Sequence, residues 1–349
     1  KHNLSEAASD VYRRLAATLA NASDYAGARE AYATAVDFCR DQGVEIQAQV
    51  CMSCMSYVLF QTGEWKQAID VCREVMEREE SPPGSKVTAE GCLGMIRAFR
   101  GESREARRLL KTTLQSSRAL KIVPMELIVL FGLAVLEEQD DNTEAADKYY
   151  RSILERWKDS EDRHDVIPGL TWAATFFARS GDDTEITQCA EALAAIASAT
   201  GNPEALAGLA YVLGESALVN KRPREAFNQF AQALTHLDTL DIPFTRAQTE
   251  YRTGVAALAA GQQDKAVAYL RSAYRSARKL AARPLAGLVA DALGKIGETV
   301  EERRNADSAE RVDRAGLTRR QVEIARLMAD GLTNREMAQK LYLSPRTVD

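Results

Sequence analysis

The chain has 349 residues, of which 46% are hydrophobic and 27% are charged, and its formal net charge is −5. This length exceeds one typical domain and predicts several units or one elongated array. No run reaches the roughly 18 apolar residues of a membrane span, and no signal peptide is evident, which argues against membrane and secreted classes. Only 20 Gly and 9 Pro occur, which favours helix throughout. Lys1 opens the chain inside a helical pattern, which indicates a fragment.

The charge is unevenly placed along the chain. From Arg314 onward, seven basic and four acidic residues give +3, so the first 313 residues carry −8. An acidic body with a basic end segment indicates that any contact with nucleic acid belongs to the last segment.

A pattern of two helices joined by a short turn recurs seven times, with a small residue opening each second helix. These anchor residues are Ala28, Ala68, Ala106, Ala145, Ile186, Ala226 and Ala266. Their spacings are 40, 38, 39, 41, 40 and 40 residues, and Ile186 keeps the register although it is not small. This repetition predicts an all-α fold, a right-handed α-solenoid of about seven helix hairpins of about 40 residues each.

The turn of each predicted hairpin lies five residues before its anchor. The seven turn residues are Ser23, Gly63, Gly101, Asp140, Gly181, Lys221 and Gly261. Gly suits this place because helices commonly end in a left-handed residue, a conformation that Gly adopts at no steric cost. Apolar or aromatic residues follow each anchor after four and eight positions, which places them on one helical face. They are Tyr32/Val36, Cys72/Met76, Leu110/Leu114, Tyr149/Ile153, Ala190/Ala194, Phe230/Leu234 and Leu270/Tyr274.

Each hairpin has one apolar face that it cannot bury alone, so neighbouring hairpins must stack. The array resembles tetratricopeptide repeats, although its unit is longer than their about 34 residues. The resemblance implies a concave surface for an effector, a peptide or a protein. Six aromatic residues of first helices are candidates either for lining that surface or for packing between repeats: Tyr57, Trp172, Phe176, Phe177, Tyr211 and Tyr251.

Six cysteines lie inside the helical patterns. Cys51 and Cys54 have the spacing of a redox or zinc pair, but no second ligand pair occurs and the three histidines lie elsewhere in the sequence. Core packing is therefore preferred over a metal site. Free thiols also indicate a reducing, cytoplasmic location.

A domain boundary is predicted where the apolar stripe ends. Residues 301–314 are dense in charge and read as a polar linker. They separate a repeat array at 1–300 from a second domain at 315–349.

The last segment contains three helix starts. Thr318 and Thr333 each precede a Gln or Glu by three positions, which is the pattern of a capping box. Ser344 followed by Pro345 is an N-cap with Pro at the first helical position. Two short helices, a tight turn and a third helix start predict a helix-turn-helix, whose later helix enters the major groove of DNA.

This segment is similar to the DNA-binding domain of LuxR-type transcription regulators. The matching residues are Leu317, Thr318, Arg320, Glu323, Gly331, Leu332, Thr333, Asn334, Glu336, Ala338, Leu341, Ser344, Thr347 and Val348. Gln321 replaces the usual Glu and Met337 the usual Ile, and both changes preserve capping and core volume. Together with the repeats, the chain resembles the large ATP-binding regulators of the LuxR family.

The resemblance implies which residues contact DNA. Helix starts and short hydroxyls position phosphates, and the face that follows reads base edges. The candidate DNA-binding residues are Thr333, Asn334, Arg335, Ser344, Arg346, Thr347, Val348 and Asp349. In the family the recognition helix continues about two turns beyond Asp349, so the segment as given is expected to bind DNA weakly, and about thirty further residues are expected to restore binding.

The sequence therefore predicts a cytoplasmic bacterial regulator that binds promoter DNA as a homodimer and whose repeats bind an effector or a partner protein. No catalytic residue, metal or cofactor is predicted, because no phosphate-binding loop or catalytic constellation occurs. ATP is expected only in a further upstream domain. Two alternatives stay open, a repeat scaffold for a protein or peptide partner and the regulatory part of a larger signal-transduction ATPase.

Overall fold

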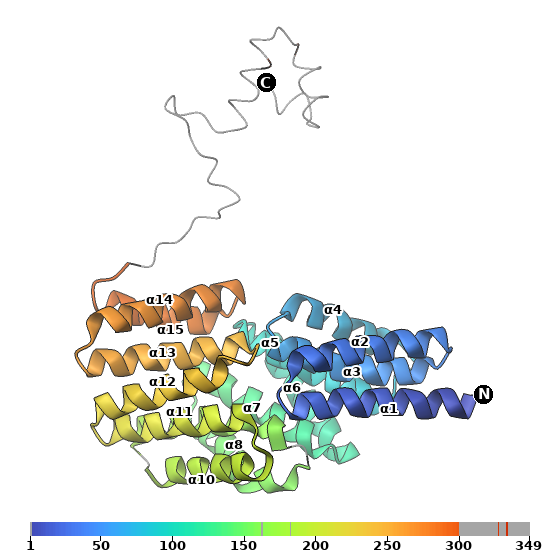
Figure 1. Ribbon diagram of the computed structural model, residues 1–349, viewed down its shortest axis with the longest axis horizontal. Coiled ribbons are helices and arrows are strands. Elements are labelled where there is room, and N and C mark those ends of the chain that lie inside the picture. The colour runs from blue at the N-terminus through green and yellow to red at the C-terminus, as the bar shows by residue number, and fades with distance from the viewer. Residues whose placement is uncertain (1, 162, 182, 300–326, 328–332, 334–349) are drawn as a thin grey trace. The chain divides into compact units, whose positions relative to one another are not determined.

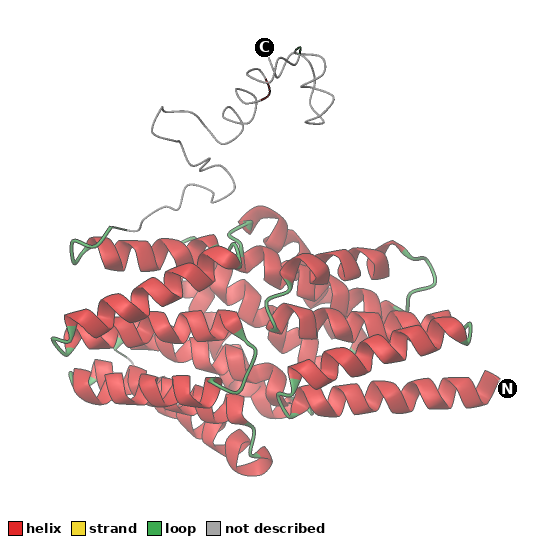
Figure 2. Cartoon of the chain, turned by 45° about the horizontal axis from the view of Figure 1, so that its top comes forward, coloured by secondary structure: helices red, strands yellow, loops and turns green. Residues whose placement is uncertain are grey.

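The computed structural model describes residues 2–161, 163–181, 183–299, 327 and 333. The chain divides into two compact units, Lys1–Thr299 and Val300–Asp349. The described residues of the first unit form helices joined by loops and contain no strand (Figure 2). None of the described helices is long and apolar enough to cross a membrane.

The described α-helices form seven consecutive hairpins and a final single helix, α15 (Arg283–Gly294). The hairpins are α1 (His2–Asn21) with α2 (Tyr25–Asp41), α3 (Glu45–Gln61) with α4 (Trp65–Glu77), α5 (Pro83–Phe99) with α6 (Ser103–Leu120), α7 (Val123–Gln139) with α8 (Thr143–Arg156), α9 (Ile167–Ser180) with α10 (Asp183–Thr200), α11 (Pro203–Val219) with α12 (Pro223–Leu237), and α13 (Pro243–Ala259) with α14 (Gln263–Lys279). Between α8 and α9 lie two short 3-10 helices, η1 (Trp157–Asp159) and η2 (Arg163–Val166). The predicted solenoid of seven helix hairpins is confirmed.

Every hairpin turn contains one residue with a positive φ. These residues are Ser23 (62°), Gly63 (78°), Gly101 (73°), Asp141 (56°), Gly181 (73°), Lys221 (56°) and Gly261 (76°). Six of them are the predicted turn residues. At the three positions without Gly, closing the hairpin imposes the left-handed conformation despite its steric cost.

The fourth repeat differs from the prediction by one residue. Its left-handed residue is Asp141 rather than Asp140, and its fully buried anchor is Ala146 rather than the half-buried Ala145. Two consecutive alanines left this register ambiguous in the sequence. Burial selects the second alanine, which also lies 40 residues before Ile186.

The residues after five of the seven anchors also differ from the prediction. After three of them the expected Met76, Leu114 and Tyr274 are half-buried, and the buried side chains are Val75, Thr113 and Ala273. In α8 the fully buried aromatic side chain is Tyr150, one position after the expected Tyr149, in line with the shifted anchor. In α10 the buried side chains are Cys189 and Leu193, whereas the expected Ala190 and Ala194 are half-buried. The larger side chains occupy the core face of α10 because they remove more apolar area from water.

A second small residue lies twelve positions before every anchor, on the first helix of the hairpin. These buried residues are Ala16, Ser56, Gly94, Ala134, Ala174, Gly214 and Gly254. A methyl group added at Gly254 would lie 2.7 Å from Leu270 Cγ, and one added at Gly214 would lie 2.9 Å from Phe230 Cε1. The side chain four positions after the anchor therefore packs directly onto the first helix, which lets the two helices approach closely.

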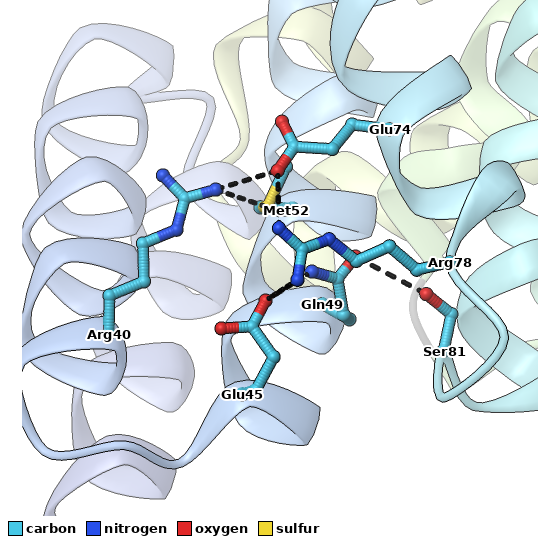
Figure 3. Close-up of polar contacts among 7 residues, drawn as sticks. All are labelled: Arg40, Glu45, Gln49, Met52, Glu74, Arg78 and Ser81. Atoms are coloured by element: carbon cyan, nitrogen blue, oxygen red, sulfur yellow. Dashed lines mark hydrogen bonds and ion pairs between the residues drawn. The ribbon is translucent and has the colours of Figure 1, made fainter.

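Charged side chains connect the first two hairpins at their surface (Figure 3). Arg40 of α2 donates to Glu74 of α4 at 2.8 Å and lies 3.4 Å from the sulfur of Met52. Arg78 pairs with Glu45 at 2.8 Å and with Glu74 at 3.5 Å. Because all four charged side chains are 39–42% exposed, each such pair contributes at most about 1 kcal/mol to stability.

The solenoid contacts itself at intervals of about 180 residues, or about four and a half repeats. The turns of the first three hairpins meet the starts of α11, α13 and α15, so that α1–α4 lie beside α11–α15 (Figure 1). The pairs in contact are Ser23 with Asn202, Gly63 with Pro243, and Gly101 with Pro284. These contacts narrow the inside of the solenoid, where the candidate site lies.

Candidate functional site

Aromatic rings from three separate hairpins stack inside the solenoid. Phe99 at the end of α5 lies 4.3 Å from Phe244 at the start of α13, centroid to centroid, with an interplanar angle of 26°. Trp172 of α9 lies 5.8 Å from Phe99 and 5.9 Å from Phe244, nearly parallel to both. Such ring pairs contribute about 0.5–1.5 kcal/mol each beyond their buried area. The three residues, here called the ring stack, hold distant repeats together.

The ring stack separates two cavities. The inner cavity has a volume of about 40 Å³, and the outer hollow has a volume of about 610 Å³. Among the described residues, Phe99, Trp172 and Phe244 are the ones that line both. Since a water molecule needs about 10–15 Å³ of such space, the inner cavity has room for a few waters only.

Two carboxylates line the inner cavity at the end formed by η2 and α11. Glu204, in the first turn of α11, is 2% exposed and accepts a hydrogen bond from Tyr25 Oη at 2.7 Å. Asp165 of η2 lines the same cavity and pairs with His164 at 3.1 Å. Burial raises the pKa of Glu204, and the nearby Asp165 charge adds to the rise. Burial likewise raises the pKa of Tyr57, which lines the cavity beside these acids.

The start of α11 holds Glu204 in place. Asn202 is the N-cap, and its Oδ1 accepts from the backbone N–H of Glu204 at 2.8 Å and of Ala205 at 3.1 Å. The same oxygen accepts from Ser23 Oγ at 3.1 Å, and Asn202 Nδ2 donates to the carbonyl of Asn21 at 2.9 Å. One side chain therefore caps α11 and ties it to the first hairpin turn.

The outer hollow has an apolar floor and charges that are already paired. Arg252 of α13 donates to Glu215 of α11 through two bonds, of 2.6 and 2.5 Å. Arg179 pairs with Glu138 at 2.8 Å. Leu288 of α15, which also lines the hollow, is 50% exposed. Each of these two arginines therefore has an acidic partner.

Two family models match parts of the chain. Residues 315–349 match the bacterial regulatory proteins of the luxR family, and residues 93–161 match a tetratricopeptide repeat. The chain combines a LuxR-type segment with tetratricopeptide-like repeats. The first of these families is regulatory and the second is a repeat family, and neither is enzymatic. No curated protein matches this chain by sequence.

Solved structures share the fold of the repeats. NprR in complex with its cognate peptide NprX is similar over 80% of this chain and 84% of NprR, with a TM-score of 0.56 and 11% identity. BtubC from P. vanneervenii has a TM-score of 0.41 and 19% identity, over 62% of this chain and 89% of BtubC. A tetratricopeptide repeat protein from Parabacteroides merdae ATCC 43184 has a TM-score of 0.41 and 13% identity, over 80% and 98%. At these identities only the fold is shared.

The six predicted aromatic residues of the repeats divide between the two expected roles. Tyr57, Trp172 and Tyr211 line the inner cavity, and Trp172 and Tyr251 line the outer hollow. Phe176 and Phe177 instead pack against Tyr150 with centroid distances of 5.0 and 6.4 Å, between repeats.

The cysteines are core residues, as predicted. All six thiols are free, and only Cys54 is half-buried rather than buried. Burial raises the pKa of Cys51 to about 12, so this thiol stays protonated at neutral pH. Among the described residues, no cluster of three or more acidic, His or Cys side chains could hold a metal ion.

The predicted DNA-binding residues lie outside the described residues, with one exception. Thr333 is exposed and not helical, and Leu327 before it is helical. Residues 334–349, which hold Asn334, Arg335, Ser344, Arg346, Thr347, Val348 and Asp349, are not among those described. These assignments rest on the sequence and stay predictions.

Sequence reasoning missed the residues that form the inner cavity. Phe99 and Phe244 lie 145 residues apart at helix ends, and no local pattern links them. Glu204 follows an N-cap and a proline, which is typical of an exposed first-turn acid and does not signal burial. The contacts of the starts of α11, α13 and α15 with distant turns were likewise not predicted.

Proposed function

We propose that this chain is the sensing and DNA-binding part of a bacterial LuxR-type transcription regulator that acts in the cytoplasm. The observation that carries the proposal is the luxR-family match at 315–349, which follows a repeat array with a cavity between distant repeats. The repeats bind an effector, and the end segment binds promoter DNA as part of a homodimer on two half-sites.

The effector is proposed to bind inside the solenoid. NprR, which shares the fold, was crystallised with its cognate peptide, and this supports a ligand-binding role for such repeats. In this chain the inner cavity of about 40 Å³ must widen to admit any effector, and a peptide would need much more widening than a small molecule. A small effector is therefore favoured over a peptide or protein partner.

Electrophoretic mobility and fluorescence anisotropy on the full native protein with its promoter DNA test the DNA-binding role. We expect specific binding that weakens as salt rises, because each phosphate contact releases counterions. Arg335→Ala should weaken binding to all sequences and reduce the slope of log K against log salt by about 1.

Arg104→Ala is the matched control for Arg335→Ala, because Arg104 is an exposed arginine of α6 in the repeat array. It should leave both affinity and salt dependence unchanged. If the full protein shows no preference for promoter DNA over unrelated DNA, the proposed function is wrong.

A further inference from the structure

The charged side chains that line the inner cavity are all acidic. Its lining contains the carboxylates of Asp165 and Glu204, and no Lys, Arg or His occurs among the described residues that line it. Aromatic side chains form much of the remaining wall. They are Tyr57, Phe60, Phe99, Phe131, Trp172, Tyr211 and Phe244.

This lining is complementary to a positive charge on an apolar body. Burying Glu204 at 2% exposure is costly unless hydrogen bonds or an opposite charge compensate it. Its neighbours supply hydrogen bonds from Tyr25 and the partial charge of a helix start, but no Lys or Arg lines the cavity beside it. Aromatic rings attract ammonium groups through the negative face of the ring, and this attraction is stronger when water is excluded.

We propose that the inner cavity binds a small organic cation, with its ammonium or amidinium group beside Glu204 and Asp165 and its apolar body against the ring stack. This proposal names the class of ligand that the repeats sense. It rests on the proposed function only for the effect of that ligand on DNA binding. Binding itself is a property of the repeats and can be measured without DNA.

The cavity must widen to admit such a ligand. The arrangement of its walls and the hollow beyond the ring stack favour this. The walls of the cavity come from α3, α5 and α7, from η2 and α9, and from α11, α12 and α13, and the turn after α3 meets the start of α13 where Gly63 lies against Pro243. The ring stack also borders the outer hollow of about 610 Å³, so open space lies on its other side. A cation beside Glu204 thus competes with the bond from Tyr25 and separates the first hairpin from α11.

The test is calorimetric titration of the purified chain with three cations, phenethylammonium, benzamidinium and benzyltrimethylammonium. Neutral 2-phenylethanol and anionic phenylacetate are the matched ligands. We expect at least one cation to bind at millimolar concentration or below and at least 10-fold more tightly than both matched ligands. If none of the cations binds, or if phenylacetate binds as tightly, the proposal is wrong, whatever the protein does with DNA.

Glu204→Gln removes the charge but retains an oxygen that can accept from Tyr25. We expect the cation to bind at least 10-fold more weakly to this variant. Glu250→Gln is the matched control, because Glu250 is another buried acid of the same array, 7% exposed, and does not line the cavity. Unchanged binding by a folded Glu204→Gln variant would overturn the proposal, and if that variant does not fold, the comparison of ligands on the wild type decides.

A second readout distinguishes charge recognition from loss of packing. Burial raises the pKa of Glu204, with Tyr25 and His164 opposing the rise and Asp165 adding to it, and a bound cation favours the ionised carboxyl. Binding should therefore release protons, seen as a heat that depends on the ionisation enthalpy of the buffer. This release should disappear in Glu204→Gln and persist in Glu250→Gln.

Discussion

Two opposing effects act on the pKa of Glu204. It lies in the first turn of α11, where the helix dipole favours a negative charge. Its burial disfavours that charge, and burial is the larger influence, so the pKa is raised from its ordinary value of 4.5. The folded protein therefore holds this proton more tightly than the unfolded chain does.

The raised pKa of Glu204 predicts a pH-dependent stability. Wherever the folded state binds more protons, stability falls as pH rises, here from about 4.5 through the raised pKa. Replacing Glu204 with Gln removes this loss. The free energy of unfolding of Glu204→Gln, relative to wild type, should increase over that window and then level off, as measured by urea denaturation between pH 4.5 and 8.

An exposed acid gives the comparison. Glu155→Gln on α8 is measured beside it, because Glu155 is an exposed acid of the same array. A difference between Glu204→Gln and wild type that stays the same at every pH would contradict the raised pKa of Glu204.

At the scale of helices, a buried ion pair joins α11 to α13. Glu215 is fully buried and Arg252 is 16% exposed, and the two form a bidentate pair. Thr175 of α9 donates a further hydrogen bond to Glu215 at 3.0 Å. The pair and its neighbour thus connect three first helices of successive repeats.

Removing one partner of this pair should be strongly destabilising. Arg252→Met leaves the Glu215 carboxylate buried without its cation, and we expect a loss of about 3–5 kcal/mol in the free energy of unfolding. The double variant Arg252→Met/Glu215→Leu removes both charges and should recover most of this loss. Urea denaturation of both variants is the measurement, and a loss below about 1 kcal/mol for the single variant would show that the pair is screened by water.

At the scale of the first unit, the contacts between distant repeats decide whether the inside of the solenoid is open or closed. Three hairpin turns each meet a helix start about four and a half repeats later. Opening these contacts would separate the walls of the inner cavity. The same contacts therefore couple effector binding to the arrangement of the repeats.

A comparison of two glycines distinguishes two effects of a hairpin turn on stability. One is its left-handed backbone conformation, and the other is its contact with a distant repeat. Gly63 and Gly261 have similar φ values of 78° and 76°, but a methyl group at Gly63 would lie 2.6 Å from Pro243 Cγ, whereas at Gly261 nothing lies within 4 Å. Both alanine variants should lose about 1–2 kcal/mol from the left-handed conformation. Gly63→Ala should lose about 1–3 kcal/mol more from the clash.

Urea denaturation and small-angle X-ray scattering measure this difference. Gly63→Ala should also increase the radius of gyration, because its clash pushes the second hairpin away from α13. Equal losses and equal radii for the two variants would show that the turn contact does not hold the solenoid closed.

Local sequence was sufficient to predict the helices, the hairpin turns and the seven repeats. Each of these depends on side chains within 13 positions of one another, from the turn residue five positions before an anchor to the apolar residue eight positions after it. The small residue twelve positions before each anchor was also readable from the sequence, and using it would have placed the fourth anchor at Ala146. The luxR-family assignment of residues 315–349 likewise came from their pattern of side chains and was then matched by the family model.

The inner cavity was decided only by the tertiary structure. Its walls meet because small rotations between successive hairpins add up over about four and a half repeats until one turn reaches a helix start about 180 residues later. The sequence of a single repeat does not show how far these rotations add up. For this reason Glu204 and Phe244 look like ordinary helix-start residues in the sequence, and they become a buried acid and part of a ring stack only when the solenoid closes.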